Sequence, residues 1–135
     1  MKNIIWLVVV LLVAAGVYLF TANGGDAQAQ TAAFRNISPQ EVKAKIENKE
    51  DIVLLDVRTP GEFNGPLGHI DNAILIPVQE LGSRIDELAP YKDKEIIVYC
   101  RSGNRSRAAT KILLKNGFNA VNMTRGMQGW NQLSK

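Results

Sequence analysis

The segment CRSGNRSR, which begins at Cys100, combines a thiol with glycine, serine, asparagine and arginine, and Cys100 is the only cysteine of the 135-residue chain. A loop of this composition between a strand and a helix can turn successive backbone N–H groups toward one point, creating a site for an anion. The helix N-terminus and nearby guanidinium groups add positive potential there. These surroundings favour the thiolate, the nucleophilic form of cysteine. We therefore predict that Cys100 is a catalytic nucleophile.

The alternative interpretation of Cys100 is a core residue, because cysteine is among the residues most often buried. This interpretation is the weaker one, since an inert buried cysteine is not usually followed by a glycine-containing turn flanked by arginines. A single cysteine excludes an internal disulfide, and the absence of a CxxC motif disfavours a disulfide oxidoreductase. The residues predicted to bind the substrate anion are Arg101, Ser102, Gly103, Asn104 and Arg105.

Short apolar runs along the chain predict the strands that position this loop. They are typical of strands buried on both faces and lie at 52–55, 73–76, 95–99 and 118–121. Helical patterns occupy 78–88 and 106–116, and a capping box from Ser38 to Glu41 predicts a further helix ending near Asn48. This alternation predicts an α/β fold with a mostly parallel sheet and helices on both faces. Ligands of such sheets bind beyond the carboxyl ends of the strands, where Cys100 lies.

The N-terminal segment from Ile4 to Phe20 is an uninterrupted run of apolar residues and glycine that follows a single charged side chain, Lys2. With Ala22 the run approaches the roughly 20 residues that cross a bilayer. We therefore expect one hydrophobic helix within residues 1–22 that contacts the membrane through residues 4–22. A signal peptide cleaved near Ala29 remains the alternative. Residues 23–33 are predicted to be a flexible linker, and residues 34–135 the folded domain.

The charge distribution predicts the location of the domain and excludes one class of partner. Lys2 precedes the apolar run and the nearest charge after it is Asp26, so the positive-inside rule leaves the N-terminus in the cytoplasm. In a bacterium the domain would then face the periplasm, held at the inner membrane or soluble after cleavage. The net charge of +3 is too small to indicate nucleic-acid binding.

Several motifs of the chain together resemble the rhodanese-type sulfurtransferases. Cys100 to Ser106 (CRSGNRS) is similar to the active-site loop of that family, and GMQGW at 126–130 is similar to its C-terminal signature. Upstream, the matching residues are Asp56-Val57-Arg58, Glu62-Phe63, Gly68-His69-Ile70, Ala73 and Ile76-Pro77. The segment Asn64 to Leu67 departs from the pattern and alters the loop at the rim of the pocket. The resemblance spans about Phe34 to the end of the chain.

The resemblance implies a three-layer fold with a five-stranded sheet and a two-step transfer of sulfane sulfur. Cys100 would take sulfur from thiosulfate or a similar donor as a persulfide and pass it to cyanide or a thiol. The backbone amides of Arg101 to Arg105 would hold the anion, with no metal or organic cofactor. One alternative is a persulfide-binding or redox-sensing module without turnover. Another is a phosphatase or arsenate reductase of the same fold, whose loops are one residue longer between cysteine and arginine.

The remaining polar residues near the motifs are expected to have structural roles. Asp56 is predicted to hold loop amides, and His69 to be structural because a cysteine activated by a helix needs no base. Arg58 and Glu62 are predicted to pair with each other across the turn. Ser106 is expected to hydrogen-bond the loop backbone.

Overall fold

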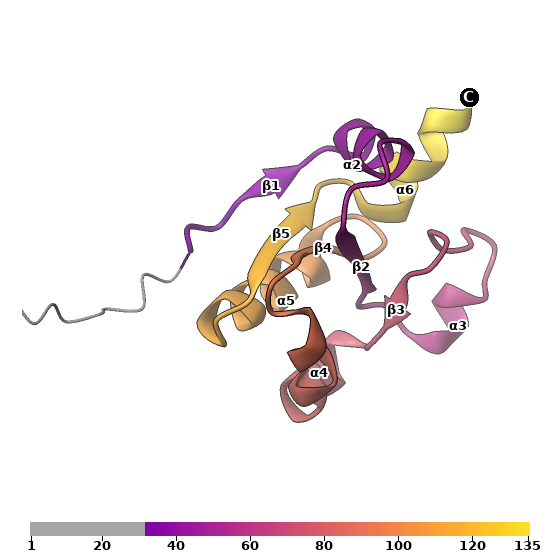
Figure 1. The fold of residues 1–135 in the computed structure, drawn as a ribbon. Helices are drawn as coiled ribbons and strands as arrows, with labels where there is room; N and C mark the ends of the chain where they lie inside the picture. Colours follow the sequence, from indigo (N-terminus) through magenta and orange to yellow (C-terminus); the bar gives the residue numbers. More distant parts are fainter. Residues whose placement is uncertain (1–31) are drawn as a thin grey trace, which may run out of the picture. The chain divides into compact units, whose positions relative to one another are not determined.

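A computed structural model of the chain describes residues 32–135, and these residues form a three-layer α/β fold around one parallel sheet (Figure 1). The sheet order is β1-β5-β4-β2-β3, and all four neighbouring pairs are parallel. The strands are β1 (Asn36–Ile37), β2 (Ile52–Asp56), β3 (Ile74–Leu75), β4 (Glu95–Tyr99) and β5 (Asn119–Met123). The predicted fold class and five-stranded sheet are confirmed.

Helices cover both faces of this sheet. They are α2 (Pro39–Glu47), α3 (Pro60–Phe63), α4 (Val78–Arg84), α5 (Asn104–Lys115) and α6 (Gly126–Asn131), with 3₁₀ turns η1 (Ile85–Tyr91) and η2 (Gln132–Ser134). Alternate strand residues point to opposite faces, so two cores form. Val98 packs in the core with Leu81 of α4 and Leu113 of α5. Its neighbour Tyr99 packs in the other core, with Val42 of α2 and Met127 of α6. Because both faces of the sheet are buried, the strands appear in the sequence as continuous apolar runs.

Local signals account for where the helices begin and end. The capping box predicted at Ser38 is present, because its hydroxyl accepts from the Glu41 N–H and the Glu41 carboxylate accepts from the Ser38 N–H. The helix predicted over 78–88 instead leaves α-helical geometry after Arg84 and continues as a 3₁₀ turn. Pro90 lies within that turn and has no N–H to extend an α-helical ladder.

The predicted membrane segment at 1–22 lies outside the described residues, as does the linker up to Thr31. Across residues 32–135, no helix is both long and apolar enough to span a bilayer.

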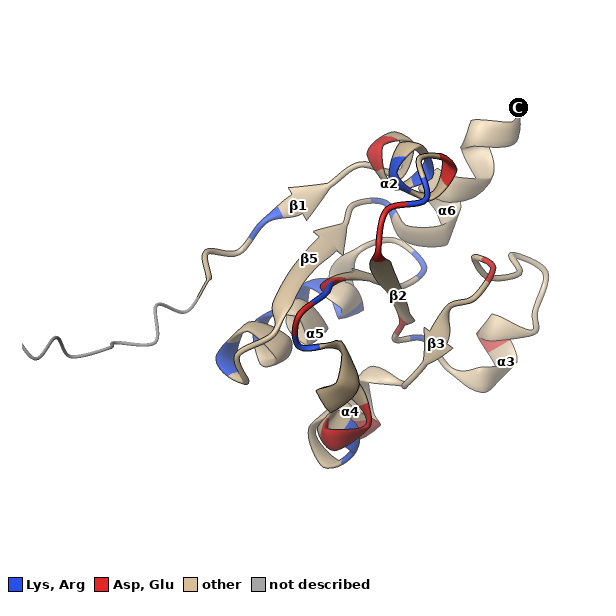
Figure 2. Cartoon of the chain, in the orientation of Figure 1, with Lys and Arg blue, Asp and Glu red and all other residues tan. Residues whose placement is uncertain are grey.

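Helix α5, which follows Cys100, carries only basic charges (Figure 2). Its sequence, NRSRAATKILLK, contains four lysine and arginine residues and no acidic residue. The basic residues nearest its N-terminus are Arg105 and Arg107, so they add positive potential beside Cys100 rather than neutralising the helix dipole.

Candidate active site

Cys100 follows β4 directly, and the loop after it turns back over its sulfur before α5 begins. The sulfur is shielded, since Cys100 is 1% exposed. Gly103 has a φ of 112°, a conformation that favours glycine, and its N–H donates to Cys100 Sγ over 3.1 Å. Ser106, in the first turn of α5, places its hydroxyl oxygen 3.4 Å from the same sulfur. The loop therefore surrounds the thiol with hydrogen-bonding groups.

These contacts lower the pKa of the Cys100 thiol. Burial by itself raises the pKa, because it disfavours the charged thiolate. The hydrogen bond with the Ser106 side chain and those with the backbone N–H groups of Ser106, Gly103 and Ser102 outweigh burial and leave the pKa below the ordinary 9.0. The predicted preference for thiolate thus has a geometric basis in the loop amides.

The five residues predicted to bind an anion occupy different positions around the sulfur. The Gly103 N–H donates to it, and the Ser102 N–H contributes to the lowered pKa of the thiol. Arg101 and Asn104 are exposed, and the Arg101 side chain lines a neighbouring cavity. Arg105 is half-buried, and the thiolate is among the negative groups that raise its pKa, after Glu62. The Gly103 N–H thus contacts the sulfur, whereas Arg101 lines the neighbouring cavity and Arg105 adds positive potential near the thiol.

Glu62 binds Arg105 and not Arg58, so the predicted Arg58–Glu62 ion pair is wrong. Two bonds of 2.7 Å join the Arg105 guanidinium to the Glu62 carboxylate. Arg105, followed in order of effect by the Thr59 backbone N–H, lowers the pKa of Glu62 to about 2 in spite of partial burial. Arg58 reaches only the backbone carbonyl of Glu62, over 3.3 Å. The arginine of the active-site loop is therefore held by α3.

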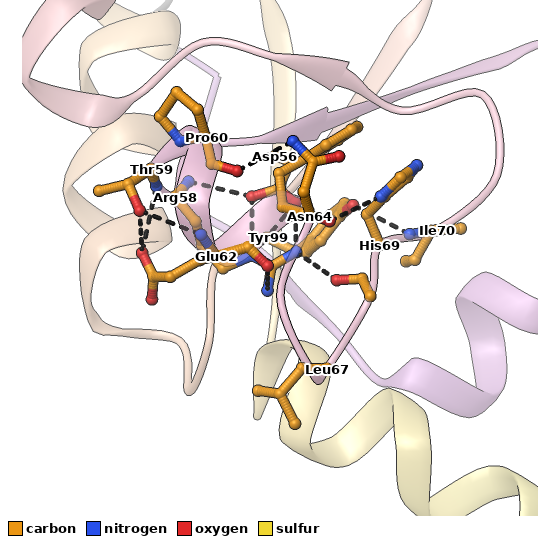
Figure 3. A network of polar contacts seen from close by, with 12 residues as sticks. Asp56, Arg58, Thr59, Pro60, Glu62, Asn64, Leu67, His69, Ile70 and Tyr99 are labelled. Atoms are coloured by element: carbon orange, nitrogen blue, oxygen red, sulfur yellow. Dashed lines mark hydrogen bonds and ion pairs between the residues drawn. The ribbon is translucent and has the colours of Figure 1, made fainter.

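Arg58 instead forms a buried ion pair with Asp56, at the carboxyl end of β2 (Figure 3). Its Nη2 lies 2.6 Å from Asp56 Oδ2 and 2.7 Å from the carbonyl oxygen of Gly68. Asp56 and Arg58 are 0% and 1% exposed. The Asp56 carboxylate also accepts from the Arg58 backbone N–H over 3.0 Å, which agrees with its predicted structural role. This pair ties the 59–68 loop to the sheet.

His69 also has a structural position in this loop. Its ring stacks on Phe63 with centroids 3.5 Å apart, and its Nδ1 lies 2.8 Å from the Phe63 carbonyl oxygen. The next residue, Ile70, donates its N–H to the Tyr99 hydroxyl over 3.1 Å. These contacts join the loop to the end of β4 and give His69 a structural role in the loop.

A cavity of about 310 Å³ opens beside the active-site loop. Arg58, Glu62, Pro66, Leu67 and Arg101 line it. Asn131 of α6 donates to the Leu67 carbonyl oxygen over 3.0 Å and so supports the rim. A slightly larger cavity of about 350 Å³ lies near Ile52 and Lys94, at the amino ends of β2 and β4, away from Cys100.

The amino end of α6 packs directly on the active-site loop, a contact that the sequence did not predict. The Met127 N–H donates to the Cys100 carbonyl over 2.9 Å, and the Gln128 N–H donates to the Arg101 carbonyl over 3.1 Å. A Cβ at Gly126 would lie 2.3 Å from the Cys100 carbonyl oxygen. Gly126, the first glycine of the GMQGW signature, is therefore required by a close backbone approach.

Comparison with known proteins identifies the family of this fold and site. The rhodanese-like domain family matches residues 38–133. A sulfurtransferase of Allochromatium vinosum is 33% identical over 95 residues, which cover 70% of this chain and 85% of that protein. The chain therefore belongs to the rhodanese-like domain family, and its membership supports a sulfurtransferase.

Solved structures share the fold. A rhodanese-like domain protein from Staphylococcus aureus superimposes with a TM-score of 0.65 at 31% identity, covering 72% of this chain and 91% of that one. A thiosulfate sulfurtransferase from Pseudomonas aeruginosa gives a TM-score of 0.67 at 29% identity. The match covers 76% of this chain but only 19% of the Pseudomonas chain.

Proposed function

We propose that this protein transfers sulfane sulfur from thiosulfate or a similar donor to cyanide or a thiol through a persulfide on Cys100. The observation that carries the proposal is the environment of the Cys100 sulfur. Its pKa is lowered by hydrogen bonds, and a loop N–H lies 3.1 Å away. Membership of the rhodanese-like family and the similarity to a thiosulfate sulfurtransferase support this choice of chemistry.

In the first step the Cys100 thiolate attacks the outer sulfur of thiosulfate. The sulfur–sulfur bond of the donor breaks, and sulfite leaves with its electron pair. The negative charge then lies on the terminal sulfur of the persulfide, where N–H groups of the loop from Arg101 to Arg105 can stabilise it. In the second step cyanide attacks that terminal sulfur, thiocyanate leaves, and the thiolate is restored.

The arginines of the site have different roles in this proposal. Arg105 is already paired with Glu62, so its net attraction for an anionic donor is reduced. Arg101 is exposed and lines the adjacent cavity. We therefore assign the recruitment of the anionic donor to Arg101, and the positioning of the loop to Arg105.

Intact-mass measurement of the full-length chain tests the proposal. Thiosulfate should add the mass of one sulfur atom, and cyanide should remove it with release of an equal amount of thiocyanate. Because Cys100 is the only cysteine, the Cys100→Ser variant should neither gain sulfur nor form thiocyanate. Failure of the unsubstituted chain to gain sulfur from any sulfane donor would refute the proposal. Phosphate esters and arsenate would then be the next substrates to test.

A persulfide-holding or sensing module without turnover is the second candidate. The 1% exposure of Cys100 favours it, because a large acceptor has little access to the sulfur. The two candidates differ in the number of thiocyanate molecules formed per protein. Continued formation with excess thiosulfate indicates a sulfurtransferase, whereas a single equivalent indicates a module that only stores sulfur.

We also propose that residues 1–22 hold the domain, residues 34–135, on the periplasmic side of a bacterial inner membrane. The apolar run from Ile4 to Phe20 behind Lys2 supports this topology. Fractionation of cells expressing the full chain tests it. A membrane-bound chain that external protease digests in spheroplasts is expected, whereas release with the periplasmic fraction would indicate cleavage near Ala29. Recovery in the cytosol would refute the topology.

A further inference from the structure

A chain of polar side chains runs from the Cys100 sulfur through the core to the edge of the sheet. Ser106 Oγ lies 3.4 Å from Cys100 Sγ and 2.6 Å from Asn122 Oδ1 on β5. Asn122 Nδ2 in turn donates to Asn36 Oδ1 on β1 over 2.9 Å. Ser106 and Asn122 are 0% and 2% exposed, whereas Asn36 is exposed. The buried side chains of Ser106 and Asn122 therefore depend on protein groups around them, and not on solvent, for their hydrogen bonds.

The Ser106 hydroxyl has one proton and more acceptors than it can serve. Asn122 Oδ1, the Gly103 carbonyl oxygen at 3.2 Å and the Cys100 sulfur are all within reach. When Cys100 is a thiol, its S–H can donate to Ser106 Oγ while Ser106 donates to Asn122. When Cys100 is a thiolate, the sulfur needs donors. If Ser106 turned its proton to the sulfur, two oxygens would face each other at 2.6 Å with no proton between them.

Rotation of the Asn122 amide removes this conflict. The oxygen and the NH₂ group are similar in size, so the amide can turn over without repacking the core. Asn122 Nδ2 would then donate to Ser106 Oγ, and the Ser106 proton would be free for the sulfur. Asn122 Oδ1 would face Asn36, whose exposed amide can turn in solvent to donate to it.

We propose that Asn122 is a positioning residue that decides whether the Ser106 hydroxyl donates its proton to the Cys100 sulfur or away from it. The thiol proton itself leaves to solvent, and no covalent bond forms or breaks in the amide chain. The consequence for catalysis rests on the proposed sulfurtransferase function. The inner sulfur is negative in the free thiolate but neutral in the persulfide, so the need for Ser106 as a donor changes in each half-reaction.

Charged groups also face this region from other elements, and the test must leave them unchanged. They come from the active-site loop, α5, α3 and the end of β2, and are Arg101, Arg105, Glu62, Asp56 and Arg58. On the β5 and β1 side, the groups linked to Ser106 are the neutral amides of Asn122 and Asn36. Substitutions at these two amides therefore change the hydrogen-bond chain and keep the arginine and carboxylate groups in place.

The test is the pH dependence of iodoacetamide alkylation of Cys100 in the full-length chain. The Asn122→Asp carboxylate can only accept, so it keeps the Ser106 proton away from the sulfur and adds negative charge. We expect the pH of half-maximal alkylation to rise by about one unit, an approximately tenfold loss of rate near neutral pH. Asn119→Asp is the matched control. It adds the same charge at the exposed beginning of β5, and its profile should be unchanged.

A double-variant comparison separates action through Ser106 from a direct charge effect. In a Ser106→Ala background, Asn122→Asp should raise the pH of half-maximal alkylation much less, because the hydroxyl that Asn122 controls is absent. An equal shift in both backgrounds would overturn the proposal, since the charge would then act on the sulfur directly. An Asn122→Asp protein that is folded by circular dichroism but has an unchanged profile would also overturn it.

Variants at Asn36, the exposed member of the hydrogen-bonded series, keep the proposal testable even if the buried substitutions unfold the protein. The Asn36→Asp carboxylate can only accept, so it holds Asn122 Nδ2 toward β1 and the Ser106 proton away from sulfur. Asn36→Ala leaves the Asn122 amide free to turn. We expect the pH of half-maximal alkylation to rise less for Asn36→Asp than for Asn122→Asp, and to stay unchanged for Asn36→Ala. Identical alkylation profiles for the two Asn36 variants would refute the proposal. Alkylation requires only the thiol, so these results stand whether or not thiosulfate loads sulfur onto Cys100.

Discussion

The contact between α6 and the active-site loop leads to a quantitative prediction for Gly126→Ala. Gly126 has a φ of 49°, in the left-handed region. A Cβ there would lie 2.3 Å from the Cys100 carbonyl oxygen and 2.6 Å from the Arg101 carbonyl carbon. Both are backbone atoms, so no side-chain rotation can relieve the overlap. The loop that carries the nucleophile must move instead.

Two contributions set the magnitude of the effect. The left-handed conformation costs an L-residue about 1–2 kcal/mol relative to glycine. Overpacking against well-packed neighbours typically costs about 1–3 kcal/mol more. We therefore expect Gly126→Ala to lower the free energy of unfolding by about 2–5 kcal/mol. The hydrogen bond from the Met127 N–H to the Cys100 carbonyl, now 2.9 Å, would lengthen, so thiocyanate formation should fall as well.

Guanidinium unfolding followed by circular dichroism measures this effect, and Gly82→Ala is the control. Gly82 lies in α4, and a Cβ there would meet nothing within 4 Å. Replacing a helical glycine with alanine normally stabilises by about 0.5–1 kcal/mol, so Gly82→Ala should be neutral or stabilising. If Gly126→Ala unfolded at the same guanidinium concentration as Gly82→Ala, the close approach of α6 to the loop would not constrain this position, and the reasoning would fail.

The remaining predictions concern the charged side chains around Cys100. The pKa of Glu62 is lowered from 4.5 to about 2, so its ion pair with Arg105 stabilises the fold fully above pH 4.5 and loses this contribution as pH falls toward 2. Glu62→Gln should therefore reduce the acid dependence of unfolding in that window, measured as the melting temperature against pH. Asp56→Ala should lower the free energy of unfolding by about 3–5 kcal/mol, because it leaves the buried Arg58 charge without its partner. The double variant Asp56→Ala/Arg58→Met should be less destabilised. Arg101→Ala should raise the KM for thiosulfate several-fold, whereas Arg107→Ala, on the exposed side of α5, should have a smaller effect.

Each of these predictions has an opposing outcome. If the melting temperature of Glu62→Gln fell at acid pH as steeply as that of the unsubstituted protein, the Glu62–Arg105 pair would contribute nothing to folding. A double variant as unstable as Asp56→Ala would mean that loss of packing, and not the unpaired Arg58 charge, causes the instability. Equal KM values for the Arg101 and Arg107 variants would assign donor recruitment to the general positive potential of the loop and α5.

Strands β2 to β5, the main helices and the position of the cysteine could be predicted because their signals are local, whereas the two-residue strand β1 has no apolar run and was missed. An apolar run such as 95–99 indicates a buried strand wherever it lies in the chain, and the capping box at Ser38 satisfies N–H groups within its own helix. The loop after Cys100 could likewise be identified from residues that are adjacent in sequence. The same reasoning missed α3, which has four residues and is too short for periodicity, although Thr59 and Glu62 form a capping box.

The tertiary structure alone decided which groups meet at the site. Glu62 lies four residues from Arg58 but pairs with Arg105, 43 residues away, because the buried Asp56 carboxylate already holds Arg58. Asn122 appears only as a polar residue in an apolar strand until β5 places it beside Ser106 of α5. Such partners depend on how β2, β5 and α6 pack around the loop. Sequence spacing determines contacts within an element, whereas packing determines contacts between elements, and the hydrogen bonds and ion pairs of this site include contacts of both kinds.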